Sequence, residues 1–85
     1  MKYIFHEDPG HGWLEVRRAE LLRLGISKTI SRYSYLSADR QRVFLEEDCD
    51  AERFILAKRA LGETVPFDRV QHDDDRIRNL SPYLA

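Results

Sequence analysis

A tight turn near the N-terminus constrains the fold more than any other feature of the chain. The turn is Asp8-Pro9-Gly10-His11, in which proline supplies a fixed φ at the second position and glycine tolerates a positive φ at the third. The flanking segments 3–5 and 14–16 have the apolar and aromatic character of β-strands. Placing Asp8 opposite His11 brings the apolar side chains to one face, so the chain is predicted to begin with a β-hairpin. A longer loop through Gly12 is the alternative, because a type II turn matches strand twist less well than the primed turns do. The predicted register pairs Tyr3 with Val16, Ile4 with Glu15, Phe5 with Leu14 and His6 with Trp13.

The rest of the chain predicts a second hairpin, two helices and a late strand. Gly25 and Gly62 each follow an apolar helical pattern and are suited to end a helix in the left-handed conformation. Pro66 confines the last strand to a sheet edge, because proline cannot donate to a central ladder. The predicted elements are a helix over 18–24, strands over 31–37 and 42–46 with a loop at Asp39-Arg40, a helix over 51–61 preceded by Asp50, a strand over 65–70, and one helical turn with Ile77, Leu80 and Tyr83.

This order of elements, ββαββαβ, indicates the fold class. Strands that arrive as hairpins favour an α+β domain with a mainly antiparallel sheet and two helices packed on one face. Residues 1–85 leave no room for a second domain. The second hairpin pairs Leu36 with Val43 on one face and leaves Tyr33, Tyr35 and Phe44 on the other. We expect that second face to form an exposed aromatic patch or part of an interface.

The cysteine content and the N-terminal segment indicate the cellular compartment. Cys49 is the only cysteine, which excludes an intramolecular disulfide and favours a reducing compartment. The N-terminus turns polar after three apolar residues, so we predict neither a signal peptide nor a membrane span, and expect a cytoplasmic location.

The net charge of −1 gives no global attraction to nucleic acid or to an anionic membrane. Residues 17–42 carry seven basic and two acidic groups, whereas residues 43–75 carry four basic and ten acidic ones. We expect these charges to cancel by packing together, and the alternative is an acidic surface that docks a basic partner.

The first turn also gathers residues that suit a metal ion or a proton transfer. In the predicted register His6, Asp8 and His11 share a face. With further ligands from a distant segment they would make a small metal-dependent hydrolase. The structural alternative is favoured, in which Asp8 caps the turn and His6 stacks on Trp13, because short motifs are unspecific without structural context. The candidate additional ligands are Glu46, Glu47, His72 and Asp73.

Two charged segments allow further interpretations. The acidic run 46–50 precedes the main helix, where carboxylates are favoured by the unpaired N–H groups and the helix dipole. Its surplus charge would suit Mg²⁺ or imitate nucleic-acid phosphates. Cys49 is predicted to be a buried small apolar residue, and the alternative is a nucleophile activated near the helix N-terminus. Basic residues Arg17, Arg18 and Arg23 on the first helix would make a nucleic-acid-binding module, although the chain has no recognised nucleic-acid motif.

Three strings of the sequence are specific enough to compare with known proteins. They are FHEDPGHGWLEV at residues 5–16, SRYSY at residues 31–35 and LEEDCD at residues 45–50. Together they resemble a group of small uncharacterised proteins encoded by bacteria, their phages and mobile elements. The resemblance implies no particular activity. It implies a context in which short genes often encode accessory proteins that bind and block host machinery, such as anti-CRISPR and anti-restriction inhibitors.

The sequence therefore favours a binding protein over an enzyme, and predicts no cofactor. We expect it to occupy a surface on a larger protein, such as a host defence or nucleic-acid-processing complex. Aromatic contacts would supply buried area, and carboxylates would supply charge complementarity. Homodimerisation is a further expectation, because 85 residues cover apolar surface with difficulty. The predicted contact residues are His6, Trp13, Tyr33, Tyr35, Glu46 and Glu47.

Overall fold

The computed structural model describes residues 2–84, which form six strands, two α-helices and one 3-10 turn. In chain order the elements are β1 (Tyr3–Glu7), β2 (Gly12–Arg17), α1 (Arg18–Arg23), η1 (Ser27–Thr29), β3 (Tyr35–Leu36), β4 (Arg42–Glu46), α2 (Asp50–Ala60), β5 (Phe67–Gln71) and β6 (Ser81–Pro82). The prediction of an α+β domain is confirmed. No helix among the described residues is long and apolar enough to cross a membrane.

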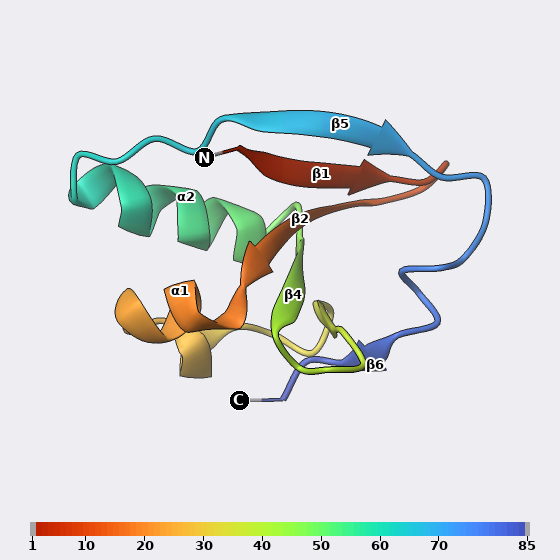
Figure 1. Cartoon of the computed structure of the whole chain (residues 1–85), viewed down its shortest axis with the longest axis horizontal. Helices are drawn as coiled ribbons and strands as arrows, with labels where there is room; N and C mark the ends of the chain where they lie inside the picture. Colours follow the sequence, from red (N-terminus) through yellow and green to blue (C-terminus); the bar gives the residue numbers. More distant parts are fainter. Residues whose placement is uncertain (1, 85) are drawn as a thin grey trace.

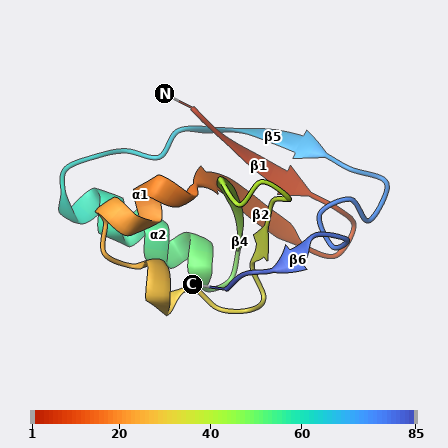
Figure 2. The ribbon, with the colours of Figure 1, turned by 60° about the horizontal axis from the view of Figure 1, so that its bottom comes forward.

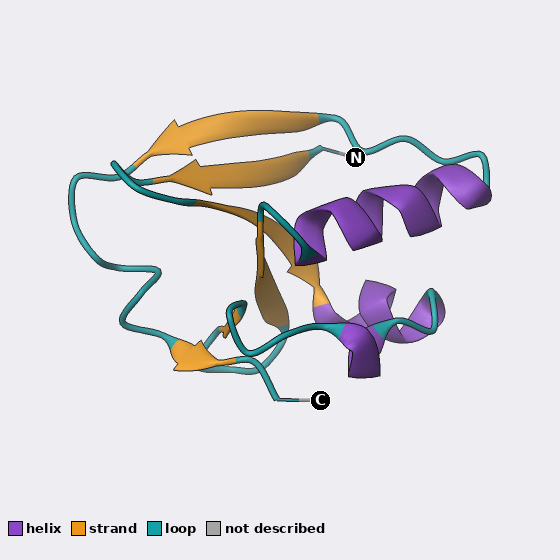
Figure 3. Ribbon diagram, turned by 180° about the vertical axis from the view of Figure 1, so that it is seen from behind, coloured by secondary structure: helices purple, strands orange, loops and turns teal. Residues whose placement is uncertain are grey.

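All strands belong to one sheet in the order β5-β1-β2-β4-β3-β6. Every neighbouring pair is antiparallel except β1 and β5, which are parallel. Both helices lie on the same side of the strands (Figures 1 and 3). The strand predicted over 65–70 is an edge strand as expected, although its parallel pairing was not predicted.

The registers of both hairpins agree with the predictions. Phe5 pairs with Leu14 and His6 with Trp13 in the first hairpin, and Leu36 pairs with Val43 in the second. The strand predicted over 31–37 is shorter, because β3 contains only Tyr35–Leu36. The residues before it form a loop that lines the site described below.

The first turn is closed by a side chain and needs no left-handed glycine. Asp8 Oδ1 accepts the N–H groups of Gly10 at 3.0 Å and of His11 at 2.9 Å. Among the four glycines, all within the described residues, only Gly25 (φ 71°) and Gly62 (φ 75°) have a positive φ. The predicted helix ends are therefore confirmed, whereas the interpretation of Gly10 as a positive-φ residue is wrong. The carboxylate of Asp8 holds the turn instead.

The main hydrophobic core lies between the sheet and the two helices. Its most buried side chains come from both layers: Leu14 and Val43 from the strands, Leu21 from α1 and Phe54 from α2. Tyr83, near the C-terminus, is also only 1% exposed, and its hydroxyl donates to the Ser27 carbonyl at 2.8 Å. This bond anchors the end of the chain to η1.

A second, smaller core covers the opposite face of the sheet. Trp13 and Phe44 pack there against Ile77 of the C-terminal segment, with Tyr35 and Leu80 at the margin. That segment passes around the end of the sheet away from the helices (Figure 2) and then pairs as β6 with β3. The tail does fold back onto the body, but β6 stands where part of a helical turn was predicted. The face predicted to be an open aromatic patch is thus partly covered by the chain itself.

The basic and acidic segments meet in a cluster around Lys58. The Lys58 side chain is 9% exposed, and its amine bonds to Glu20 at 3.0 Å and to Glu63 at 2.9 Å. Arg23 also bonds to Glu63 at 2.9 Å. Burial alone would lower the pKa of Lys58, but the hydrogen bonds to Glu63 and Glu20 outweigh it and raise the pKa. The cluster ties α1, α2 and the loop after α2 together.

This cluster predicts a specific loss of stability in acid. The hydrogen bond from Arg23, and then that from Lys58, lower the pKa of Glu63 from 4.5 to about 2. A carboxyl group whose pKa is lowered by folding contributes stability above its unfolded pKa, and this contribution disappears as the pH falls through the folded value. The thermal midpoint should therefore fall more steeply from about pH 5 to about pH 2 in the wild type than in Glu63→Gln. Asp68→Asn is the control, because the Asp68 ion pair with Lys2 is exposed. Parallel pH curves for the wild type and Glu63→Gln would contradict this account.

Candidate functional site

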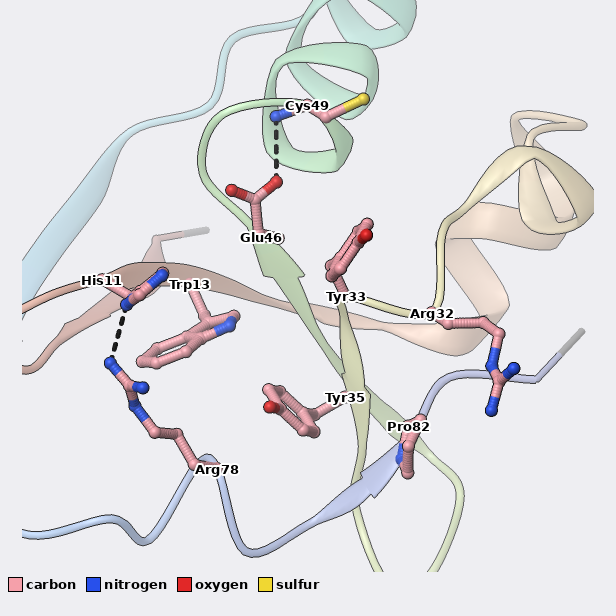
Figure 4. A pocket seen from close by; sticks show the side chains of 9 residues that line it. All are labelled: His11, Trp13, Arg32, Tyr33, Tyr35, Glu46, Cys49, Arg78 and Pro82. Atoms are coloured by element: carbon pink, nitrogen blue, oxygen red, sulfur yellow. Dashed lines mark hydrogen bonds between the residues drawn. The ribbon is translucent and has the colours of Figure 1, made fainter.

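A pocket of about 480 Å³ opens on the face of the sheet that the C-terminal segment covers. Its walls come from the tip of the first hairpin, the loop before β3, strands β2 to β4, the residue before α2, and the C-terminal segment (Figure 4). The lining residues are His11, Trp13, Arg32, Tyr33, Tyr35, Glu46, Cys49, Arg78 and Pro82. Two neighbouring depressions share Arg32 and Pro82 with this pocket, so the concave surface is extended.

Four of the six predicted contact residues line this pocket: Trp13, Tyr33, Tyr35 and Glu46. Trp13 is only 3% exposed and forms the floor, where it meets the edge of Tyr35 at a centroid distance of 6.0 Å. Tyr33 is 78% exposed and stands at the rim. The three aromatic residues predicted from the sequence therefore line one pocket. Trp13 is buried at its floor, whereas Tyr33 is exposed at its rim.

Arg78 joins the C-terminal segment to the first hairpin at one wall of the pocket. Its guanidinium donates to both carboxylate oxygens of Asp8, at 2.8 and 3.2 Å, and to His11 Nδ1 at 2.7 Å. It also lies 5.7 Å from the ring centre of Trp13, within the range of a cation–π contact. The hydrogen bond from Arg78 holds the pKa of Asp8 well below its ordinary value. The sequence analysis did not identify Arg78, since no local pattern links it to a turn 70 positions away.

His6, Asp8 and His11, which were predicted to suit a metal ion together, each bond to other side chains instead. His6 bonds through Nε2 to Glu15 at 2.7 Å and through Nδ1 to His72 at 2.8 Å. Burial, and then the neighbouring His6, lower the pKa of His72. Asp8 and His11 instead hold Arg78. Within residues 2–84 no group of three or more His, Cys, Asp or Glu side chains is placed to hold a metal ion.

The acidic run before α2 has several separate roles. Glu46 accepts the N–H groups of Asp48 at 3.0 Å and Cys49 at 3.1 Å, which caps the approach to the helix. Glu47, the remaining predicted contact in this run, lines a different groove beside α2. Cys49 is exposed at the pocket wall, so the prediction that it is buried is wrong. The carboxylates are therefore distributed over two surfaces.

Asp50 is a buried anchor for the loop that carries Arg32 and Tyr33. The sequence predicted that Asp50 precedes the helix, but in the structure it is the first residue of α2. Its side chain is fully buried. Its Oδ2 accepts the hydroxyl groups of Ser31 and Ser34, both at 2.6 Å, and the Ser31 N–H at 3.0 Å. Because Ser31 and Ser34 flank Arg32 and Tyr33, these bonds set the position of the pocket rim.

The basic residues of α1 do not form one open face. Arg23 is paired with Glu20 and Glu63, and the Nε of Arg18 is buried without a hydrogen-bond partner among the described residues. Arg17, which is the last residue of β2, and Arg23 are exposed, whereas Arg18 is half-buried. A continuous phosphate-binding surface on this helix is not favoured.

Comparisons with models of known protein families, with curated protein sequences and with solved structures give no significant match. Homology therefore supplies no residue roles for this site. The functional argument depends on the geometry of the pocket and its rim.

Proposed function

We propose that this chain is a small non-enzymatic accessory protein that binds a larger protein through the pocket and its rim. The observation that carries the proposal is Tyr33, which is 78% exposed beside a pocket floored by Trp13 and Tyr35. Tyrosine, tryptophan and arginine are the residues that most often dominate binding energy at protein interfaces. A tyrosine held by an anchored loop loses little conformational freedom when it binds.

The charges around the pocket indicate the chemistry of the partner. Glu46 is occupied by backbone N–H groups, and Arg78 is neutralised by Asp8. Arg32 has no ion-pair partner among residues 2–84 and lies on the pocket and on both neighbouring depressions. We therefore expect an acidic side chain of the partner to meet Arg32, beside an apolar group that fills the aromatic pocket. This differs from the earlier expectation that the carboxylates supply the complementary charge.

Inhibition of a host complex is the form of binding that the sequence resemblance implies. An accessory protein of this size blocks a larger enzyme by covering a surface, without performing chemistry of its own. Its effect should therefore be stoichiometric. The alternatives of a metal-dependent hydrolase and of a nucleic-acid-binding module are not favoured by any particular contact in the structure.

Affinity capture with matched variants tests this proposal. Wild type, Tyr33→Ala and Leu22→Ala are used as baits in a lysate of the host bacterium, and Leu22 is the control because it is 61% exposed on α1. We expect the wild type and Leu22→Ala to recover the same protein, and Tyr33→Ala to recover at least ~10-fold less of it. Addition of the wild type in equal amount should lower the activity of that purified partner. Failure to recover a specific protein, or equal recovery with all three baits, would contradict the proposal.

A further inference from the structure

Helix α2 exposes a stripe of four residues that its role in the core does not explain. Glu52, Ile55, Leu56 and Arg59 are spaced by three, one and three positions, which places them on one face of the helix. The buried residues Ala51, Phe54 and Lys58 occupy a different face. Leu56 is 54% exposed although it is fully apolar. We define these four residues as the α2 stripe.

The α2 stripe forms one wall of an apolar groove of about 330 Å³. The opposite wall belongs to β1 and β5, where Phe5 and the 40% exposed Phe67 contribute aromatic surface. In Figure 1, β1 and β5 lie above α2 and to its right, so that they begin near the N-terminal end of the helix. The groove shares no lining residue with the proposed binding pocket.

The stripe carries opposite charges at equal distances on either side of its centre. Glu52 lies three positions before Ile55, and Arg59 lies three positions after Leu56, so reversing the helix direction exchanges an acidic end for a basic end. Neither Glu52 nor Arg59 has an ion-pair partner among residues 2–84. The two unpaired opposite charges flank an apolar pair in which Leu56 is exposed and Ile55 is half-buried, and this is the pattern of a self-complementary surface.

We infer that the α2 stripe binds the same stripe of a second copy, with the two helices antiparallel about a two-fold axis between Ile55 and Leu56. In this arrangement Glu52 faces the partner's Arg59, and Arg59 faces the partner's Glu52. Ile55 and Leu56 pack at the centre, and the aromatic groove walls cover them from the side. An isologous interface uses each residue twice, so one self-complementary stripe supplies two ion pairs. The reversed order of charges on a second copy of α2 is complementary to this stripe, and this favours a second copy over a different protein as the partner.

The dimer leaves both binding pockets open, because the groove and the pocket have no lining residue in common. Two copies joined through α2 would present two equivalent Tyr33 rims. The dimer would therefore bind two partners, or two sites of one oligomeric partner, with a gain from effective concentration. This inference stands whether or not the pocket binds a protein, because none of the residues that it uses lines the pocket.

Sedimentation equilibrium of the purified full chain tests the inference. We expect the wild type to be a dimer whose dissociation constant rises by ~100-fold in Leu56→Glu, because a central apolar contact is replaced by two like charges. Leu22→Glu introduces the same change at the 61% exposed Leu22 of α1 and should leave the dimer unchanged. Circular dichroism of each variant checks that the fold is retained.

Charge reversal gives a second test that misfolding cannot imitate. E52R and R59E should each weaken the dimer by ~10-fold or more, since each places like charges opposite one another twice. An equimolar mixture of E52R and R59E should dimerise again, because each copy then carries the charge that the other lacks. A wild type that stays monomeric up to about millimolar concentration would overturn the inference, since a dimer weaker than that gains under about 4 kcal/mol. Equal effects of Leu56→Glu and Leu22→Glu, or a mixture that remains monomeric, would also overturn it.

Discussion

Replacing Asp50 with alanine is expected to lower the free energy of unfolding by about 3–5 kcal/mol, the largest effect that we predict for a single polar side chain here. The carboxylate is completely buried and accepts three hydrogen bonds from Ser31 and Ser34. Alanine would leave these donors without a partner in the interior. A domain of this length is stabilised by only about 5–10 kcal/mol, so the variant should be close to unfolding at room temperature.

Asp50→Asn is the matched control for this prediction. The amide keeps the size of the side chain and one acceptor oxygen but replaces the other oxygen with an NH₂ donor, so we expect a loss of about 1–2 kcal/mol. Urea unfolding followed by tryptophan fluorescence measures both variants, because Trp13 is the single tryptophan and is buried. Since Ser31 and Ser34 flank Arg32 and Tyr33, Asp50→Asn should also weaken partner binding through the loop. Equal stability of the wild type and Asp50→Ala would show that Asp50 does not anchor this loop.

Gly12→Ala is expected to lower the free energy of unfolding by about 1–3 kcal/mol through overpacking. A Cβ atom at this position would lie 2.7 Å from Phe5 Cε2, and closer still to Cζ of the same ring. The ring has little freedom to move away, because it packs against Phe67 at 5.7 Å and beneath the Arg69 guanidinium at 5.4 Å. The new methyl group would therefore displace Phe5 or the backbone of β2.

Gly10→Ala, two positions earlier in the same turn, is the control for Gly12→Ala. Its Cβ would meet only Arg78 Nη2, at 3.2 Å, and its φ is not positive. We expect this variant to change stability by less than about 0.5 kcal/mol. Thermal unfolding of both variants compares the two positions directly. If Gly10→Ala were the more damaging change, the turn would depend on a left-handed glycine after all.

The hairpins were predictable because their determinants are local. In the first hairpin the alternation of strand residues and the Asp8 turn act over a short stretch of chain, and only one register places Phe5 beside Leu14. The helix ends at Gly25 and Gly62 were equally local. Periodicity and turn residues were sufficient to predict the elements whose conformation depends on neighbours in sequence.

The remaining features depend on contacts between distant segments. The bond between Arg78 and Asp8, the parallel pairing of β5 with β1, and the coverage of Trp13 by Ile77 all join the C-terminal segment to the N-terminal hairpin. No spacing in the sequence distinguishes Arg78 from Arg76, which instead pairs with Asp74 in its own loop. For the same reason the second sheet face was expected to be more open than it is.

The candidate site was predictable in its aromatic residues and not in its charges. Trp13 and Tyr35 share a pocket because strand alternation and the paired registers place them on one side of the sheet. Tyr33 reaches the rim of the same pocket from the loop that Asp50 anchors, where the sequence predicted part of a strand over 31–37 instead. The roles of the carboxylates followed from contacts that only the folded chain creates. Glu46 caps backbone N–H groups, Asp50 holds a loop, and Arg32 is left as the charged group at the rim.

Photo-crosslinking at position 33 tests the central claim, that the pocket rim is the surface that binds a partner. A photoreactive phenylalanine analogue replaces Tyr33 in one sample and the exposed Leu22 in another, and both are irradiated in the host lysate. We predict a covalent adduct with one host protein from position 33 and none from position 22, with the adduct suppressed by excess unlabelled wild type. Adducts of equal yield from both positions, or no adduct from position 33, would contradict the claim.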